Sequence, residues 1–192
     1  MKILFLYHNE QAKELAKQLE SKGHILILWK ERLSVENLET LCPERVLSYT
    51  YRYIISNEVI GFCKYPIINL HISYLPWNRG ADPNFWNFME NTPKGVTIHQ
   101  IDGGIDTGKI ILQKELFFDE EKETFASSYQ KLNEEIMSLF LGNVENILAN
   151  AIRGVETSSK GSYHNKKELM EFRKKHPFSW EEGIADLKRS VL

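Results

Sequence analysis

Residues 2–23, KILFLYHNEQAKELAKQLESKG, contain the pattern that decides the fold class. Ile3 to Tyr7 form an uninterrupted apolar run of the length of one buried strand. The residues that follow have helical spacing on one apolar face, and this face consists of Ala12, Leu15, Ala16 and Leu19. Gly23 supplies a stop signal. A buried strand followed directly by an amphipathic helix is a β-α unit, which indicates an α/β protein.

The same alternation continues to residue 71. We expect strands within HILILW (24–29, a second buried strand), RVLSYT (45–50) and PIINLH (66–71), and short helices within SVENLETL (34–41) and at 56–63. Strands that alternate with helices pair in parallel through right-handed crossovers. The sequence therefore predicts a Rossmann-like, doubly wound and mostly parallel sheet with helices on both faces.

The pattern changes after Gly80. A helix is predicted over 82–90, then two neighbouring strands over 95–102 and 108–118, and then a long helix over about 124–152 that packs across the sheet. The remaining residues contain two short amphipathic stretches. We predict a single domain over 1–192, with 1–150 as its core and 151–192 as a C-terminal extension.

Composition restricts the function classes. The 192 residues are 42% hydrophobic and 26% charged with a net charge of −2, as in an ordinary globular protein. A nucleic-acid partner is not expected, because the chain has no excess of basic residues. The apolar run at the N-terminus is too short for a signal peptide, and no apolar stretch reaches the ~18 residues of a membrane span. Cys42 and Cys63 lack metal-ligand spacing. We expect a cytoplasmic protein without a membrane or nucleic-acid partner.

Two polar residues end the fourth predicted strand. Asn69 and His71 are separated by one residue, so their side chains point to the same face of the strand. Ligands of open α/β sheets bind at the carboxyl ends of the strands, which is where this pair lies. The pair either forms part of an active site or is a hydrogen-bonded pair that closes the strand.

A second polar cluster lies in GVTIHQIDGGIDTGKII, residues 95–111. Gly103 and Gly104 break the strand and allow a loop that carries Asp102 and Asp106 to approach another backbone closely. We expect Asp106 to lie beside His71, where a carboxylate fixes the imidazole tautomer or moves a proton through water. His99 alternates with apolar residues, which favours a supporting role over a chemical one.

The two clusters together resemble the folate-dependent formyltransferases. The resemblance rests on N-x-H-x-S-x-L-P from Asn69, on Gly80, and on G-x-T-x-H-x-x-D-x-x-x-D-x-G-x-I from Gly95. The family includes glycinamide ribonucleotide, methionyl-tRNA and nucleotide-sugar formyltransferases. The resemblance implies the formyltransferase fold, an N-formyltransferase activity with N10-formyltetrahydrofolate as formyl donor, and no metal. It makes Asn69, His71 and Asp106 the catalytic triad, with Ser73 and His99 in support.

The resemblance also places the pterin pocket of the folate. The pocket is expected between the loop after the third strand and the loop before the second catalytic carboxylate. The corresponding residues are Tyr51, Arg52, Tyr53 and Ile54, and Asp102, Gly103, Gly104 and Ile105. Apolar walls with backbone donors and acceptors suit a flat pterin ring, although the tyrosines and isoleucines could equally belong to the core.

Features that the sequence lacks narrow the choice among the acceptors used by this family. LYHNEQAKEL, residues 6–15, has no glycine-rich phosphate loop, which disfavours glycinamide ribonucleotide. An RNA-binding domain and a basic surface, expected of a methionyl-tRNA enzyme, are not recognisable. We therefore expect a nucleotide-linked amino sugar of surface-polysaccharide biosynthesis as acceptor. Its predicted contacts are Trp77, Arg79, Gly80 and Trp86, with Arg79 toward the phosphates and both indoles able to stack or to serve the core.

Three alternatives remain open from the sequence. They are glycinamide ribonucleotide formylation, hydrolysis of formyltetrahydrofolate, and a catalytically idle folate-binding protein. The last is disfavoured by the intact triad. A homodimer is compatible with each.

Overall fold

A six-stranded sheet forms the centre of the protein. The computed structural model describes residues 1–156 and 160–191. The strand order is β2-β1-β3-β4-β6-β7. The strands are β1 (Lys2–Tyr7), β2 (Ile25–Trp29), β3 (Arg45–Tyr49), β4 (Ile68–His71), β6 (Lys94–Gln100) and β7 (Ile110–Leu116). The first four pair in parallel, and β6 is antiparallel to β4 and to β7. The predicted fold class is confirmed.

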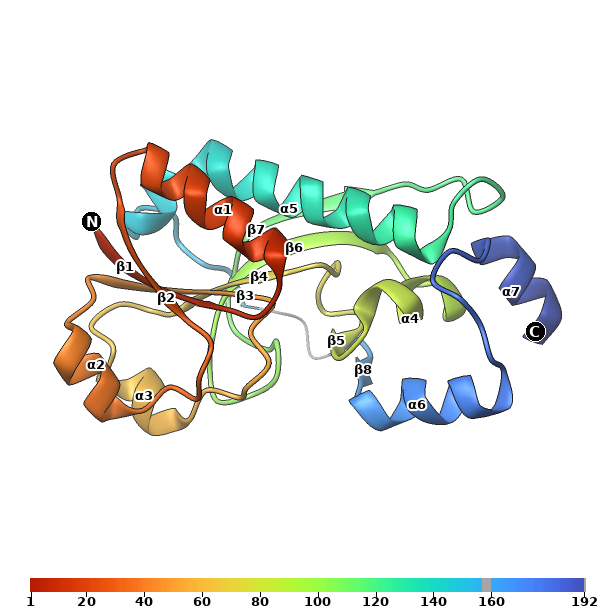
Figure 1. Ribbon diagram of the computed structural model, residues 1–192, viewed down its shortest axis with the longest axis horizontal. Coiled ribbons are helices and arrows are strands. Elements are labelled where there is room, and N and C mark those ends of the chain that lie inside the picture. Colours follow the sequence, from red (N-terminus) through yellow and green to blue (C-terminus); the bar gives the residue numbers. More distant parts are fainter. Residues whose placement is uncertain (157–159, 192) are drawn as a thin grey trace.

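Helices cover both faces of this sheet (Figure 1). Helices α1 (Glu10–Ser21) and α5 (Phe125–Leu148) lie on one face, and α2 (Val35–Leu41) and α3 (Asn57–Phe62) lie on the other. Side-chain oxygens cap these helices at their first turns: Asn9 accepts from the Ala12 N–H, and Ser34 and Thr124 form capping boxes. The local sequence therefore fixes where the helices start.

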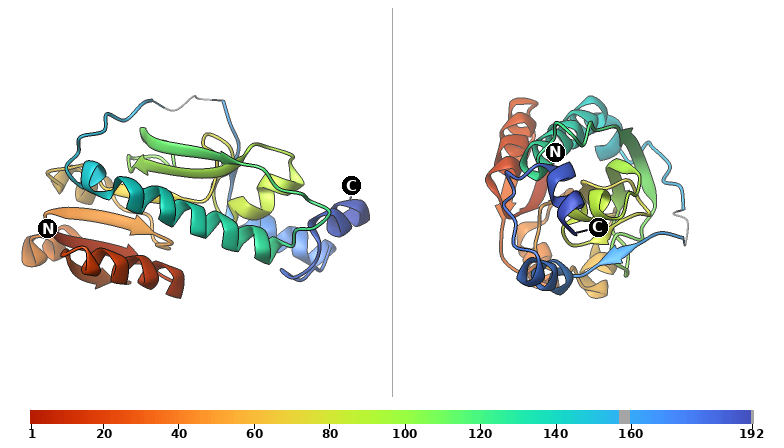
Figure 2. Two further views of the ribbon diagram at one scale, coloured as in Figure 1. Left: turned by 90° about the horizontal axis from the view of Figure 1, so that it is seen from above. Right: turned by 90° about the vertical axis from the view of Figure 1, so that its right-hand side faces the viewer.

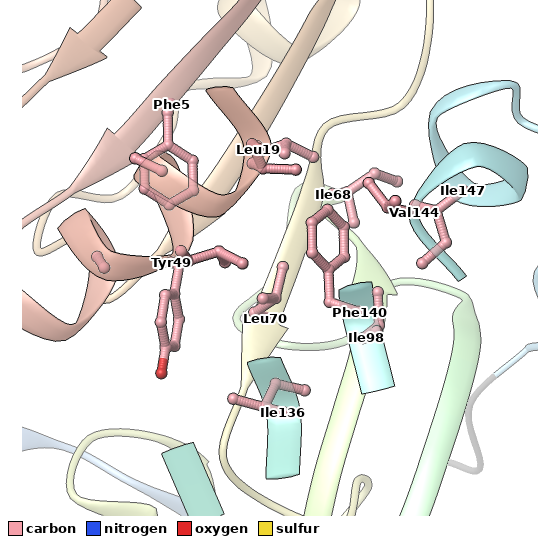
Figure 3. Packing of buried hydrophobic residues seen from close by; sticks show 14 of the residues in the cluster. Phe5, Leu19, Tyr49, Ile68, Leu70, Ile98, Ile136, Phe140, Val144 and Ile147 are labelled. Carbon is pink, nitrogen blue, oxygen red and sulfur yellow. The ribbon is translucent and has the colours of Figure 1, made fainter. Parts of the chain in front are cut away.

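Alternate residues of β1 pack on opposite faces, which explains its uninterrupted apolar run. Ile3 and Phe5 join the core beneath α1 and α5, whereas Leu4 and Leu6 join the smaller core beneath α2 and α3. In the larger core, Leu70 from the sheet lies close to Ile136 and Phe140 of α5, and Phe5 lies on the side of α1 (Figure 3).

The prediction that 24–29 is a buried strand is wrong. β2 pairs only with β1 and forms an edge of the sheet, so Ile25 is 66% exposed and Leu28 is 43% exposed. An apolar run of this length cannot by itself distinguish a central strand from an edge strand.

The C-terminal residues pack on the core through aromatic side chains. Helices α6 (Lys166–Lys175) and α7 (Ile184–Val191) gather at the end of the molecule where α5 begins (Figure 2). Phe178 stacks on Phe85 of α4 (Pro83–Met89) at 5.1 Å between ring centroids, and Leu169 and Leu187 complete this cluster. The predicted extension is thus held against α4 and α5 by buried apolar surface.

A second, two-stranded sheet connects the extension to the centre of the protein. β5 (Arg79–Gly80) pairs in parallel with β8 (Tyr163–His164).

Within residues 1–156 and 160–191, no helix combines the length and apolar composition needed to cross a bilayer.

Candidate active site

The carboxyl end of β4 brings three of the predicted residues together with His99. β4 and β6 are antiparallel, and their register places Asn69 directly opposite His99. Asn69 Nδ2 lies 3.1 Å from His99 Nε2 and 3.5 Å from Asp106 Oδ1. His71 Nε2 lies 3.7 Å from Asp106 Oδ2. The four polar side chains therefore form one compact cluster.

Asp106 occupies the centre of this cluster. Its backbone is left-handed, with φ of 52°, a conformation that Asp tolerates better than most residues. Oδ2 accepts the Gly80 N–H at 2.8 Å, and Oδ1 lies 3.4 Å from His99 Nε2. Fixed contacts on both oxygens hold the carboxylate in one orientation next to His71.

The charge states of His71 and Asp106 follow from their surroundings. Burial lowers the pKa of His71, and the opposing effect of Asp106 does not reverse this shift. Burial alone would raise the pKa of Asp106, but the imidazoles and the Gly80 N–H outweigh it and hold that pKa well below its usual range. Because the lowered pKa leaves His71 neutral at pH 7, the Gly80 N–H at 2.8 Å is the donor that stabilises the carboxylate there. The site pairs a neutral imidazole with an anionic carboxylate.

His99 has a defined tautomer. Its Nδ1 lies 2.8 Å from the Gln100 carbonyl oxygen, which can only accept, so Nδ1 carries a proton. In the neutral ring, Nε2 then accepts from the Asn69 amide, which orients that amide. His99 is buried at 1% exposure and His71 at 8%, and both line the cavity described next.

A cavity of about 700 Å³ opens in front of this cluster. One side of it consists of the loops after β3 and after β6, and all eight residues predicted for the pterin line it: Tyr51, Arg52, Tyr53, Ile54, Asp102, Gly103, Gly104 and Ile105. Ile54 is 75% exposed and Ile105 is 38% exposed, so both present apolar surface. Both side chains are therefore available to a flat ring, and their contacts with folate stay a prediction.

The opposite side of the cavity comes from β5, β8 and the start of α6. It consists of Gly80, Ala81, Asp82 and Pro83 together with Tyr163, His164, Asn165 and Lys166. In Figure 1, α2 and α3 lie on the left of the view, and β8 and α6 lie on the right. The C-terminal extension thus supplies a wall of the cavity, which nothing in its sequence indicated.

Gly80 joins the polar cluster around Asp106 to this second wall. Its φ is 89°, and a Cβ there would lie 2.3 Å from the His164 carbonyl oxygen. Only glycine allows the two strands to approach this closely while the Gly80 N–H reaches Asp106.

Three of the predicted acceptor contacts lie outside the cavity lining. Arg79 Nε lies 3.4 Å from the Ser162 carbonyl oxygen, Trp86 stacks on His164 at 4.2 Å between ring centroids, and Trp77 also lies outside the lining. Gly80 is the predicted acceptor contact that lines the cavity. Any role of the other three in acceptor binding stays a prediction.

Ser73 and Asn78 shape the loop after β4. The Ser73 hydroxyl donates to the Trp77 carbonyl at 2.7 Å, in keeping with a supporting position. Asn78, which the sequence analysis missed, is completely buried, and its amide donates to Asn87 and Thr92 at 2.6 Å each. Its own carbonyl faces His71 Nε2 at 3.4 Å. A buried Asn within a loop carries no periodic signal that would have identified it.

A metal site was not expected from the sequence. Within residues 1–156 and 160–191, no group of three or more His, Cys, Asp or Glu is arranged to hold a metal ion. That the reaction needs no metal stays a prediction.

Comparison with known proteins decides the family. The formyl transferase family matches residues 7–141, which include Asn69, His71, His99 and Asp106. The chain belongs to the formyl transferase family. The resemblance inferred from the motifs at Asn69 and Gly95 is thereby confirmed.

Methionyl-tRNA formyltransferases are among the relatives of this chain. A methionyl-tRNA formyltransferase of Ehrlichia ruminantium is 34% identical over 136 residues, 69% of this chain and 44% of the relative. The chain spans less than half the length of such curated relatives.

A solved structure corresponds to nearly the whole chain. The formyltransferase PseJ from Anoxybacillus kamchatkensis is 38% identical, has a TM-score of 0.89, and is covered to 97%, as is this chain. That structure is a complex with UDP-4,6-dideoxy-4-formamido-L-AltNAc and tetrahydrofolate.

Proposed function

We propose that this protein transfers the formyl group of N10-formyltetrahydrofolate to the primary amine of a nucleotide-linked amino sugar. The acceptor is a UDP-linked 4-amino-4,6-dideoxy sugar, and the product is the corresponding 4-formamide. A role in the biosynthesis of surface polysaccharides, within the cytoplasm, follows from such a substrate.

One observation carries this proposal: the likeness to PseJ includes the C-terminal extension. The match covers 97% of both chains at 38% identity, and the PseJ complex contains a UDP-linked 4-formamido sugar. Methionyl-tRNA formyltransferases match up to 91% of this chain, but at 28% identity and with only 57% of that relative covered. Because the extension forms one wall of the cavity, a relative that matches it at higher identity and over its own full length is the better guide to the acceptor.

The cluster geometry suits formyl transfer to an amine. The acceptor nitrogen attacks the formyl carbon, a C–N bond forms, and the carbonyl oxygen becomes an oxyanion. The Asn69 amide, oriented by His99, and the neutral His71 imidazole act as hydrogen-bond donors toward this oxygen. The oxyanion then collapses and the bond to N10 of the folate breaks.

Asp106 completes the proton balance. Its carboxylate is ionised at neutral pH and lies next to His71, so it takes the proton that the attacking amine loses. The same proton is then delivered, through water or His71, to the departing folate nitrogen. The products are tetrahydrofolate and the N-formylated sugar.

A single-turnover assay tests the proposal. Protein and N10-formyltetrahydrofolate are mixed with the UDP-linked 4-amino sugar, with glycinamide ribonucleotide, with initiator methionyl-tRNA or with no acceptor. We expect rapid formylation of the sugar alone. Efficient transfer to the ribonucleotide or the tRNA without transfer to the sugar would refute the acceptor assignment, and equally fast release of formate without acceptor would indicate a hydrolase.

A further inference from the structure

Asp82 is a carboxylate of the cavity wall that the fold itself does not use. It occupies the N-cap position of α4, where an Asp side chain ordinarily accepts a backbone N–H of the first turn. Here it makes no such hydrogen bond, and its backbone is left-handed with φ of 53° and ψ of 41°. Among residues 1–156 and 160–191, the carboxylate has no hydrogen-bond or salt-bridge partner.

The position of Asp82 relative to the catalytic cluster is set by a short chain segment. Gly80 donates its N–H to Asp106 at 2.8 Å, and Asp82 follows two residues later, a span of at most roughly 7 Å. Both Asp82 and Asp106 line the same cavity. Because both residues line one cavity and Asp82 follows closely on the backbone N–H bound to Asp106, one bound acceptor can contact both.

The charge around Asp82 favours a neutral hydrogen-bond donor over a phosphate. Burial raises the pKa of Asp82, and Lys166 from α6 partly offsets this effect. A carboxylate repels a diphosphate, whereas it accepts strong hydrogen bonds from hydroxyl and amide N–H groups. Asp82 belongs to the part of the lining formed by β5, β8 and the start of α6, and not to the loops predicted to hold the folate.

We propose that Asp82 is a specificity-determining residue whose carboxylate accepts a hydrogen bond from a hydroxyl or amide N–H on the amine-bearing ring of the acceptor. This inference rests on the proposed function and adds to it the residue that recognises the sugar ring. Lys166 has a secondary role as the cation that keeps the carboxylate ionised. Bound in this way, the ring presents its amine to His71 and Asp106.

Steady-state kinetics of Asp82→Asn and Asp82→Ala test the role. Asp119→Asn is the matched control, since Asp119 is an exposed aspartate outside the cavity that pairs with Lys122. We expect Asp82→Asn to raise the KM for the UDP-linked 4-amino sugar about tenfold or more, because removing a polar partner leaves the bound donor unpaired. The KM for N10-formyltetrahydrofolate and the kcat should change less than about threefold, and Asp119→Asn should behave as wild type.

Two acceptor analogues, one without the hydroxyl next to the amine and one without the amide N–H, supply a measurement that a merely structural role of Asp82 would not change. Wild type should lose affinity for one of these analogues, whereas Asp82→Ala should bind that analogue and the parent sugar equally. Lys166→Met should raise the acceptor KM by a smaller factor, with Lys167→Met as its neighbouring control.

Each remaining outcome is decisive. The assignment of Asp82 would be overturned by any of three results: an unchanged acceptor KM in both Asp82 variants, an equal rise in the folate KM, or a loss confined to kcat. If wild type still formylates the sugar in that case, the proposed function stands. Binding of the sugar to wild type is measured by calorimetry with 5-formyltetrahydrofolate present, and formylation is measured with N10-formyltetrahydrofolate. If wild type neither binds nor formylates the sugar, the proposed function fails and this inference fails with it.

Discussion

Replacing Gly80 by alanine should weaken both the fold and the catalytic cluster. Gly80 has φ of 89°, and an added Cβ would lie 2.3 Å from the His164 carbonyl oxygen and 2.8 Å from the Tyr163 ring. Real Cβ contacts are essentially never below 3.0 Å, so the facing strand must retreat by about 0.7 Å or more. The tyrosine ring can rotate away, but the backbone oxygen cannot.

Two effects set the size of the expected loss. Left-handed backbone costs a residue with a Cβ roughly 1–2 kcal/mol. Separation of the strands weakens the bonds from Ala81 N to His164 O and from Arg79 N to Ser162 O, each worth about 1 kcal/mol. We expect Gly80→Ala to lower the free energy of unfolding by about 3–4 kcal/mol, which corresponds to a fall in Tm of roughly 10 °C for a chain of this size.

Urea and thermal unfolding, together with kcat, measure this prediction. The matched control is Gly142→Ala, because Gly142 lies within α5 and a Cβ there meets no atom within 4 Å. That control should gain about 0.5–1 kcal/mol from helix propensity. Gly80→Ala should also lose activity, because the Gly80 N–H moves away from Asp106. A Gly80→Ala protein within about 1 kcal/mol of wild type in unfolding free energy would refute the reasoning.

Three further results are expected. Asp106→Asn and His71→Ala should each lower turnover by at least ~10²-fold while 5-formyltetrahydrofolate binding, measured by calorimetry, stays near wild type, because the cavity walls and not these groups hold the folate; near-native turnover in either variant would contradict their catalytic role. Burial lowers the pKa of His71 from 6.5, so the neutral ring persists to lower pH and the acid limb of the kcat/KM profile should have its midpoint below 6.5; a midpoint above 6.5 would show that neutral His71 is not the active form. Arg79→Ala should raise the KM for the nucleotide sugar far more than the folate KM if the guanidinium faces the diphosphate, and equal KM values in the variant and wild type would exclude Arg79 from acceptor binding.

Local sequence patterns were sufficient for most of the fold. The β-α alternation, the helix starts at Asn9, Ser34 and Thr124, and the long helix all depend on residues close in sequence. The burial of β2 could not be predicted in this way. Whether an apolar run lies at the centre or the edge of a sheet depends on which strands join it, and β1 lies between β2 and the rest.

The same distinction between local sequence and tertiary structure applies to the site. Asn69 and His71 share a strand face, and the paired glycines predicted a loop that brings Asp106 near them, so sequence alone determined the composition of the cluster and the family. Only the tertiary structure decided the opposite wall. β8 pairs with β5 across more than 80 residues, and this pairing places Lys166 beside Asp82 at the cavity. Neither residue belongs to a periodic or spaced pattern, because a contact between distant segments depends on the whole path of the chain and leaves no local signature.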